Sequence, residues 1–293
     1  MTTTMPAPEL HEAADLGTSR GRILTGLRHN RLGMVGGGLL LFVVLAAVLA
    51  PWIAPYPPDE VHFATPFQLP RTVGFPLGTD DLGRDILSRV LHGTGASLQV
   101  GVLAVGLAIA VGAPLGLLAG YWQRLDGVIS RLTDLLLAFP FLIVAVGLAA
   151  INGASLGNAA VALGLAQVPT MIRVVRAETM RLKSHEFVLA ARSMDASGAR
   201  ILATHILPNA LSSVIVQATV IMPVAVIGEA LLSFLGLGIQ PPSPSLGIML
   251  ADAQQYIVRA PYAAVFPGLA IVVICLAFNL FGDALRDVLG PRR

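Results

Sequence analysis

Residues 186–208, EFVLAARSMDASGARILATHILP, form the longest run of the chain that is neither strongly apolar nor built from turn residues. Four apolar residues recur in it at i, i+3, i+4 and i+7: Phe187, Ala190, Ala191 and Met194. This spacing predicts a short helix with one small apolar face. Ser184 is placed to cap that helix, and Glu186 falls in its first turn, where the dipole favours negative charge. Because Pro208 then opens a new apolar segment, the run predicts a polar helix-turn-helix that can receive a soluble partner.

The same residues resemble the cytoplasmic loop of bacterial ABC importer permeases. That loop reads Glu-Ala-Ala, three residues, Gly, nine residues, Ile-x-Leu-Pro, and the matches at this spacing are Ala190, Ala191, Leu207 and Pro208. Leu189, Asp195 and His205 replace the Glu, the Gly and the Ile. The Gly lies at the bend between two short helices, and Asp is among the few residues that tolerate a left-handed backbone there. An ordinary amphipathic linker is the alternative, but the spacing from Ala-Ala to Leu-Pro favours the family loop.

Composition indicates a membrane protein. Of the 293 residues, 55% are hydrophobic and 12% are charged, whereas about 25% are charged in an average soluble domain. The single cysteine, Cys275, lies in an apolar run, so no disulfide can form within the chain and a metal cluster is not expected. The basic residues are 18 Arg and one Lys, a bias that indicates a GC-rich genome and not a nucleic-acid partner.

Six apolar segments are long enough to span a bilayer. They are residues 32–54, 98–121, 131–150, 156–176, 209–231 and 265–283. Residues 55–97 form a mixed loop rich in Pro, Asp and Gly. With the N-terminus inside, the inner segments hold fifteen Arg and Lys and the outer segments hold four. This asymmetry predicts that both termini and the loop at 186–208 lie in the cytoplasm.

Residues 77–85, LGTDDLGRD, lie in the predicted outer loop. Their aspartates lack the ligand spacing of a calcium loop. The run resembles a signature of permeases in the dipeptide, oligopeptide and nickel import family, with matches at Gly78, Thr79, Asp80, Gly83, Arg84 and Asp85. Residues 231–242, LLSFLGLGIQPP, resemble a second stretch of that family. With these matches, the chain resembles the C-type subunit, which is the second of the two permeases that such importers use.

Two enzyme classes are disfavoured by the sequence. Residues 153–157, GASLG, fit the G-x-S-x-G nucleophile pattern, but no histidine lies in a predicted span to act as base for Ser155. A tight turn is therefore favoured over a hydrolase. The only lysine, Lys183, lacks the preceding glycines of a phosphate-binding loop, so energy must come from elsewhere.

Two features inside the spans are candidates for function or packing. Glu229, near the outer end of the fifth span, is a possible gate residue, although a hydrogen bond to a neighbouring helix is favoured. Gly112, Gly116 and Gly120 repeat every four residues, which predicts a closely packed helix–helix seam. No cluster of polar residues indicates a ligand pocket.

The chain is thus predicted to be an all-α membrane protein with six transmembrane helices, cytoplasmic termini and the fold of an ABC type I importer permease. Three parts are expected. Residues 1–31 form a cytoplasmic tail, residues 32–97 the first transmembrane helix with an external loop, and residues 98–293 a five-helix core that contains the coupling loop 177–208.

The resemblance implies the permease subunit of an ATP-driven importer that moves di- or oligopeptides by alternating access. The implied partners are a homologous second permease, two cytoplasmic ATPase subunits, an extracytoplasmic substrate-binding protein and membrane lipid, with no nucleic acid. ATP and magnesium would be held by the ATPases, so the chain is expected to bind no cofactor and to be no enzyme. The alternatives are a nickel or other small-solute importer of the same family, or an ion-gradient-driven secondary carrier.

Overall fold

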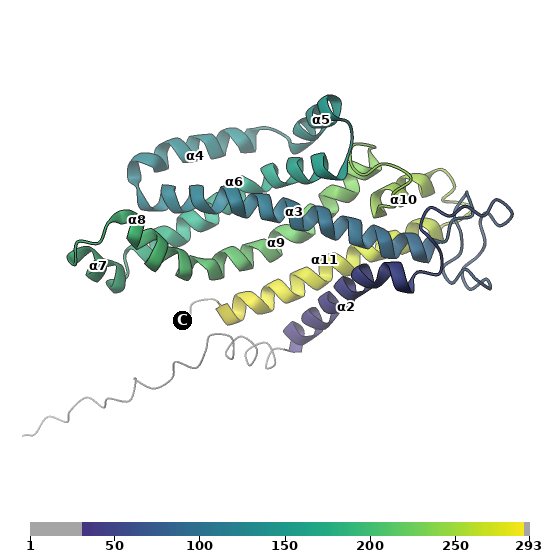
Figure 1. Cartoon of the computed structure of the whole chain (residues 1–293), viewed down its shortest axis with the longest axis horizontal. Helices are drawn as coiled ribbons and strands as arrows, with labels where there is room; N and C mark the ends of the chain where they lie inside the picture. The colour runs from purple at the N-terminus through teal and green to yellow at the C-terminus, as the bar shows by residue number, and fades with distance from the viewer. Residues whose placement is uncertain (1–30, 290–293) are drawn as a thin grey trace, which may run out of the picture.

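The computed structural model describes residues 31–289, and within that range the chain folds into a bundle of long helices without β-strands (Figure 1). Within the described residues, five helices are long and apolar enough to cross a membrane, and there are six such spans if one bent pair of helices is counted as a single span. The five are α2 (Arg31–Ile53), α3 (Ile86–Tyr121), α6 (Leu156–Lys183), α9 (Leu207–Phe234) and α11 (Tyr262–Leu289). Except for Arg31, the predicted tail 1–31 lies outside the described residues.

The third predicted span is not one straight helix. It is divided into α4 (Gln123–Ala138) and α5 (Phe141–Asn152), which are bent by 78° relative to each other. Pro140 stands at the break, and the preceding residue, Phe139, is extended at φ −90° and ψ 120°. A proline ring disfavours helical backbone in the residue before it, which accounts for the break. The apolar segment predicted over 131–150 is therefore broken at Pro140, and it remains one span if α4 and α5 cross the membrane together.

The outer loop is shorter than predicted because α3 begins at Ile86 and not near residue 98. Asp85 caps this helix: its carboxylate accepts hydrogen bonds from the Ser88 N–H at 2.8 Å and from the Ser88 hydroxyl at 2.6 Å. Side-chain acceptors at this position satisfy N–H groups that have no partner within the helix. The predicted boundary at residue 97 thus falls inside α3, and the division into three parts stays a prediction.

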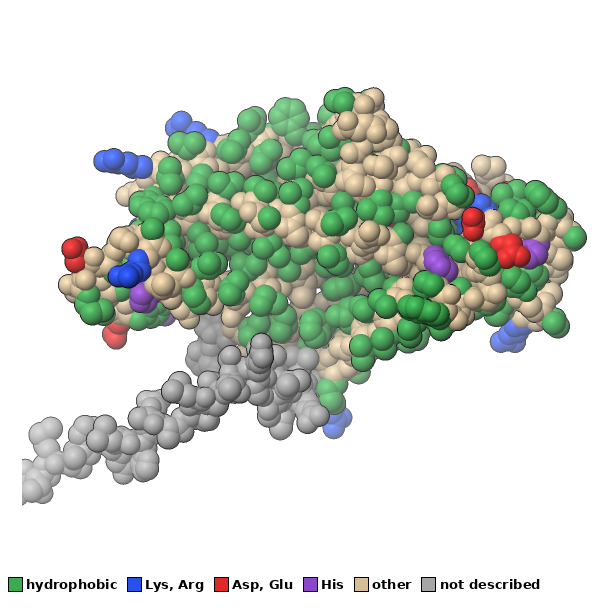
Figure 2. All heavy atoms as spheres, viewed as in Figure 1, with side chains coloured by type: hydrophobic (Ala, Val, Ile, Leu, Met, Phe, Trp, Pro, Cys, Tyr) green, Lys and Arg blue, Asp and Glu red, His purple; other side chains and the backbone are tan. Residues whose placement is uncertain are grey.

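The short elements lie at the two ends of the bundle (Figure 1). At one end are α7 (Glu186–Ser193), α8 (Gly198–Ile201) and the π-helical turn η1 (Leu202–Ile206). At the other end are the loop before α3 and the short helix α10 (Leu246–Gln254). Figure 2 shows that charged side chains gather at these two ends, while hydrophobic side chains cover the region between them. This distribution fits a protein that crosses a bilayer.

The glycines predicted to form a seam lie where α3 packs against α6. A Cβ atom on Gly116 would lie 2.8 Å from both the carbonyl oxygen of Ile172 and the Cβ of Val175. On Gly112 it would lie 2.7 Å from the Cβ of Met171. Because the side chain of glycine is a single hydrogen atom, the backbones of α3 and α6 approach more closely here than they could with any other residue.

Candidate functional site

The predicted coupling loop forms a small folded unit with its own apolar interior. Its buried residues come from the ends of three long helices as well as from α7, α8 and η1: Tyr121, Leu182, Val188, Ala191, Ile201, Leu202, Ile206 and Ala210. Tyr121 ends α3, Leu182 lies near the end of α6, and Ala210 lies in the first turns of α9. The loop is therefore packed onto three long helices at once.

The apolar face of α7 differs from the predicted one. Ala191 is only 2% exposed and packs inward together with Val188, which the prediction left out. Ala190 is exposed, as are Phe187 and, at 77%, Met194. The positions 188 and 191 are separated by three residues and so share a face, and this face fills the interior of the unit. The predicted placement of Ala191 on the outward face is wrong.

The ends of the loop are formed partly as predicted. Asp195 has a left-handed backbone, φ 57°, at the bend between α7 and α8, so the bend survives the loss of glycine. Pro208 lies in the first turn of α9, directly after the π-helical turn η1. Ser184, however, does not cap α7. Because α6 continues to Lys183, the Ser184 hydroxyl donates to the carbonyl of Arg181 at the end of that helix.

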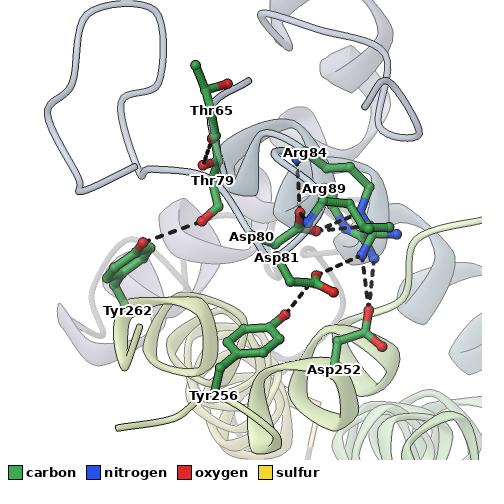
Figure 3. A network of polar contacts seen from close by, with 10 residues as sticks. Thr65, Thr79, Asp80, Asp81, Arg84, Arg89, Asp252, Tyr256 and Tyr262 are labelled. Atoms are coloured by element: carbon green, nitrogen blue, oxygen red, sulfur yellow. Dashed lines mark hydrogen bonds and ion pairs between the residues drawn. The ribbon is translucent and has the colours of Figure 1, made fainter. Parts of the chain in front are cut away.

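The outer signature forms a polar network that joins three elements (Figure 3). Asp80 accepts hydrogen bonds from the Leu82 N–H at 3.0 Å and the Arg84 N–H at 2.9 Å, and its second oxygen lies 2.6 Å from Nε of Arg84. Arg89 in α3 lies 3.3 Å from the same oxygen, and Asp252 in α10 pairs with both arginines at 3.3 and 3.6 Å. We call these residues, Asp80, Arg84, Arg89 and Asp252, the outer clamp.

Other signature residues fold the outer loop itself. The Thr79 hydroxyl donates to the carbonyl of Thr65 at 2.7 Å and accepts the Gln68 N–H at 2.8 Å. Gly78 and Gly83 have φ values of 83° and 75°, which favour glycine. A Cβ on Gly83 would lie 2.1 Å from the carbonyl oxygen of His62. The signature therefore gives this loop its shape.

Burial dominates the electrostatics around α10. It raises the pKa of Asp252 above its ordinary value, although Arg89 and Arg84 act in the opposite direction. Burial, together with the neighbouring carboxylates Asp81 and Asp80, also raises the pKa of Tyr256 well above its ordinary value. Tyr256 therefore stays protonated and donates its hydroxyl hydrogen to Asp81 at 3.1 Å.

Glu229 is fully buried and accepts hydrogen bonds from three serine hydroxyls. The donors are Ser97 in α3 at 2.5 Å, Ser233 in α9 at 2.8 Å and Ser245 before α10 at 2.8 Å. Ser233 belongs to the second family stretch, and its oxygen accepts the Ile239 N–H, which directs its hydrogen toward Glu229. The favoured hydrogen bond to a neighbouring helix is thus present, and a role of Glu229 in gating stays a prediction.

Ser155 is used as a helix cap. Its hydroxyl accepts the Asn158 N–H at 3.2 Å at the start of α6. The expectation that no histidine lies in a spanning helix is wrong, since His92 is part of α3 and lines the same cavity of about 950 Å³ as Ser155. His92 Nδ1 lies 2.9 Å from the carbonyl oxygen of Ser88.

A polar cavity that the sequence did not predict lies at the α7 end of the bundle. This inner cavity measures about 500 Å³ and lies between α6, α9 and α11. One wall is a stripe of α9 at i, i+3, i+4 and i+8: Asn209, Ser212, Ser213 and Gln217. The periodicity of these polar residues within an apolar segment was a usable signal. The sequence did not indicate this cavity because α6 and α11 complete it with distant residues, and whether it holds a ligand is not tested.

Comparisons with known proteins agree with this architecture. The fold is similar to that of an inward-facing MetNI methionine ABC transporter, with a TM-score of 0.57 and 20% sequence identity over 68% of this chain and 96% of that chain. At this identity the similarity concerns the fold alone.

Relatives and family matches cover most of the sequence. The dipeptide transport system permease protein DppC of Alkalihalophilus pseudofirmus is 42% identical, over 91% of this chain and 88% of that protein. The glutathione transport system permease protein GsiD of Escherichia coli is 42% identical, over 90% and 88%. Residues 20–70 match the N-terminal transmembrane domain of oligopeptide transport permease C. Residues 112–293 match the inner membrane component of binding-protein-dependent transport systems. The chain therefore belongs to this family and is a multi-pass inner-membrane permease of the ABC importer class.

Proposed function

We propose that this chain, together with a homologous second permease, forms the membrane path of an ATP-driven importer of di- and oligopeptides. The observation that carries the proposal is the 42% identity to a permease named for dipeptides over 91% of the chain. The similar glutathione permease fits the same class, because glutathione is itself a tripeptide. ATP and magnesium would be held by two cytoplasmic ATPase subunits, and an external binding protein would deliver the peptide.

The packing of the coupling loop supports a mechanical role in this importer. The buried cluster joins the loop to Tyr121 of α3, Leu182 of α6 and Ala210 of α9. Because close-packed interiors resist compression, a movement of α7 is passed on to these three helix ends. ATP-driven closure of the ATPases would in this way tilt the helices that line the path and alternate the access of the peptide.

Reconstitution tests the proposed substrate and energy source. The chain is assembled in proteoliposomes with its second permease, two ATPases and the binding protein, and uptake of a radiolabelled dipeptide, glutathione or nickel is measured. ATP-dependent uptake of the dipeptide is expected. Uptake of nickel alone would favour the small-solute alternative, and uptake driven by a proton gradient without ATPases would favour a secondary carrier.

Two neighbouring alanines separate docking from folding in α7. Ala190→Glu places a charge on the exposed face, and we expect the folded permease to lose its ATPases. Leaving a charge desolvated and unpaired in an interface costs about 2–5 kcal/mol. Ala191→Glu buries the charge in the loop interior, so that variant should lose the folded loop itself.

Pull-down of the ATPases and thermal melting of the purified permease distinguish these effects. Arg200→Glu in α8 serves as the control, because Arg200 is exposed and its side chain makes no hydrogen bond or ion pair within residues 31–289. The proposal predicts that the Ala190→Glu permease melts at the wild-type temperature but binds no ATPase. Normal ATPase binding by Ala190→Glu would show that this face of α7 is not the docking surface.

A further inference from the structure

We infer that the inner cavity is the cytoplasmic release vestibule of the path, and that its α9 wall binds the backbone of a departing peptide. The inference rests on the proposed function, which it extends by naming the residues of this chain that the peptide meets. The cavity measures about 500 Å³ and lies between α6, α9 and α11.

The polar stripe of α9 is placed where polar groups are costly unless they face water or a solute. Ser212, Ser213 and Gln217 face the cavity, and within residues 31–289 their side chains have no hydrogen-bond partner. Leu211 and Ile215, at other positions around the same helix, are about half exposed at the protein surface. The helix thus keeps apolar residues outward and hydrogen-bonding groups toward the cavity.

The depth of the stripe fits a path and not a surface hollow. Gln217 lies 10 residues after Leu207, the first residue of α9. At about 1.5 Å per residue this is about 15 Å along the helix axis. The hydrocarbon core of a bilayer is about 30 Å thick, so Gln217 lies about half of that thickness away from the α7 end of α9.

The chemistry of the lining suits the part that all peptides share. Serine hydroxyls and a glutamine amide can bind backbone N–H and C=O groups whatever the peptide side chains are. At the mouth, Glu178 pairs with Arg181 at 2.6 Å, and Arg286 of α11 is exposed without a partner in the described chain. The acidic and basic side chains at the mouth can pair with both charged ends of a zwitterionic peptide. Several weak contacts also allow the peptide to leave, whereas one strong binding site would retain it.

The mouth is also connected to the coupling loop. Phe187 of α7 and His185, the residue before it, both line the cavity. A movement of α7 that follows the ATPases therefore changes the shape of the mouth directly. This contact gives the vestibule a means of opening in step with ATP hydrolysis.

Cysteine labelling tests the location of the vestibule. Cys275 is the only cysteine, so Cys275→Ser provides a cysteine-free background. Ser213→Cys and Gln217→Cys are introduced singly into the assembled importer, with Ile215→Cys as the matched control on the same helix. In inside-out vesicles a charged, membrane-impermeant maleimide should label positions 213 and 217 at least about tenfold faster than position 215. Equal rates at 213 and 215, or no labelling at 217, would overturn the inference.

Uptake then tests the role of the lining. Gln217→Leu should lower ATP-dependent dipeptide uptake by about tenfold, the effect of a 1.4 kcal/mol loss, while Gln217→Asn retains most of it. Wild-type uptake by Gln217→Leu would exclude a role in binding peptide. Labelling does not depend on the substrate. If the cysteine variants label as expected but the wild-type importer takes up no dipeptide, the result would count against the proposed function alone.

Discussion

Gly116→Leu is expected to prevent stable packing of α3 against α6. Even a Cβ atom at this position would lie 2.8 Å from the Ile172 carbonyl oxygen and from the Cβ of Val175. These are backbone and branch-point atoms that cannot rotate away, so the helices must separate. Overpacking of this kind costs about 1–3 kcal/mol and occasionally more. We expect the melting temperature of the purified permease in detergent to fall by roughly 5–10 °C.

Gly106→Leu is the matched control for this prediction. Gly106 lies in the same helix, is exposed, and would place its Cβ in open space with nothing within 4 Å. Leucine also has a better helix propensity than glycine, by somewhat less than about 1 kcal/mol. Gly106→Leu should therefore melt at or above the wild-type temperature. If both variants melt alike, the close approach at Gly116 does not limit stability.

Asp80→Asn should release the outer loop from α3 and α10. The substitution keeps the size of the side chain but removes the charge that faces Arg84 and Arg89. Arg89 is only 2% exposed, and its remaining partner, Asp252, lies 3.6 Å away. Removing one member of a buried ion pair typically costs about 3–5 kcal/mol, because the other charge stays buried without compensation. We expect faster proteolysis within residues 54–85 from the outer side and a lower melting temperature.

Asp59→Asn in the same loop is the control, since Asp59 is exposed and its side chain makes no ion pair within residues 31–289. A second arm removes both buried charges: Asp80→Asn combined with Arg89→Met should be more stable than Asp80→Asn alone. Proteolysis of Asp80→Asn at the wild-type rate would mean that the outer clamp does not hold the loop.

Local sequence alone determined the features that depend on neighbouring residues or on overall polarity. The apolar runs predicted the spanning segments, and the motifs at 77–85, 186–208 and 231–242 identified the family. The left-handed bend at Asp195 also followed from the residue type, because few residues other than glycine tolerate that backbone.

Only the tertiary structure decided which side of α7 is buried and where the polar groups meet. Helical periodicity gives candidate faces, but Val188 and Ala191 point inward because α6 and α8 offer them an apolar surface. Ser97 and Glu229 are 132 residues apart and meet through the packing of α3 and α9. The inner cavity likewise needs α6, α9 and α11 together. Such long-range contacts leave no local pattern in the sequence, because the two partners lie far apart along the chain and become neighbours only in the folded protein.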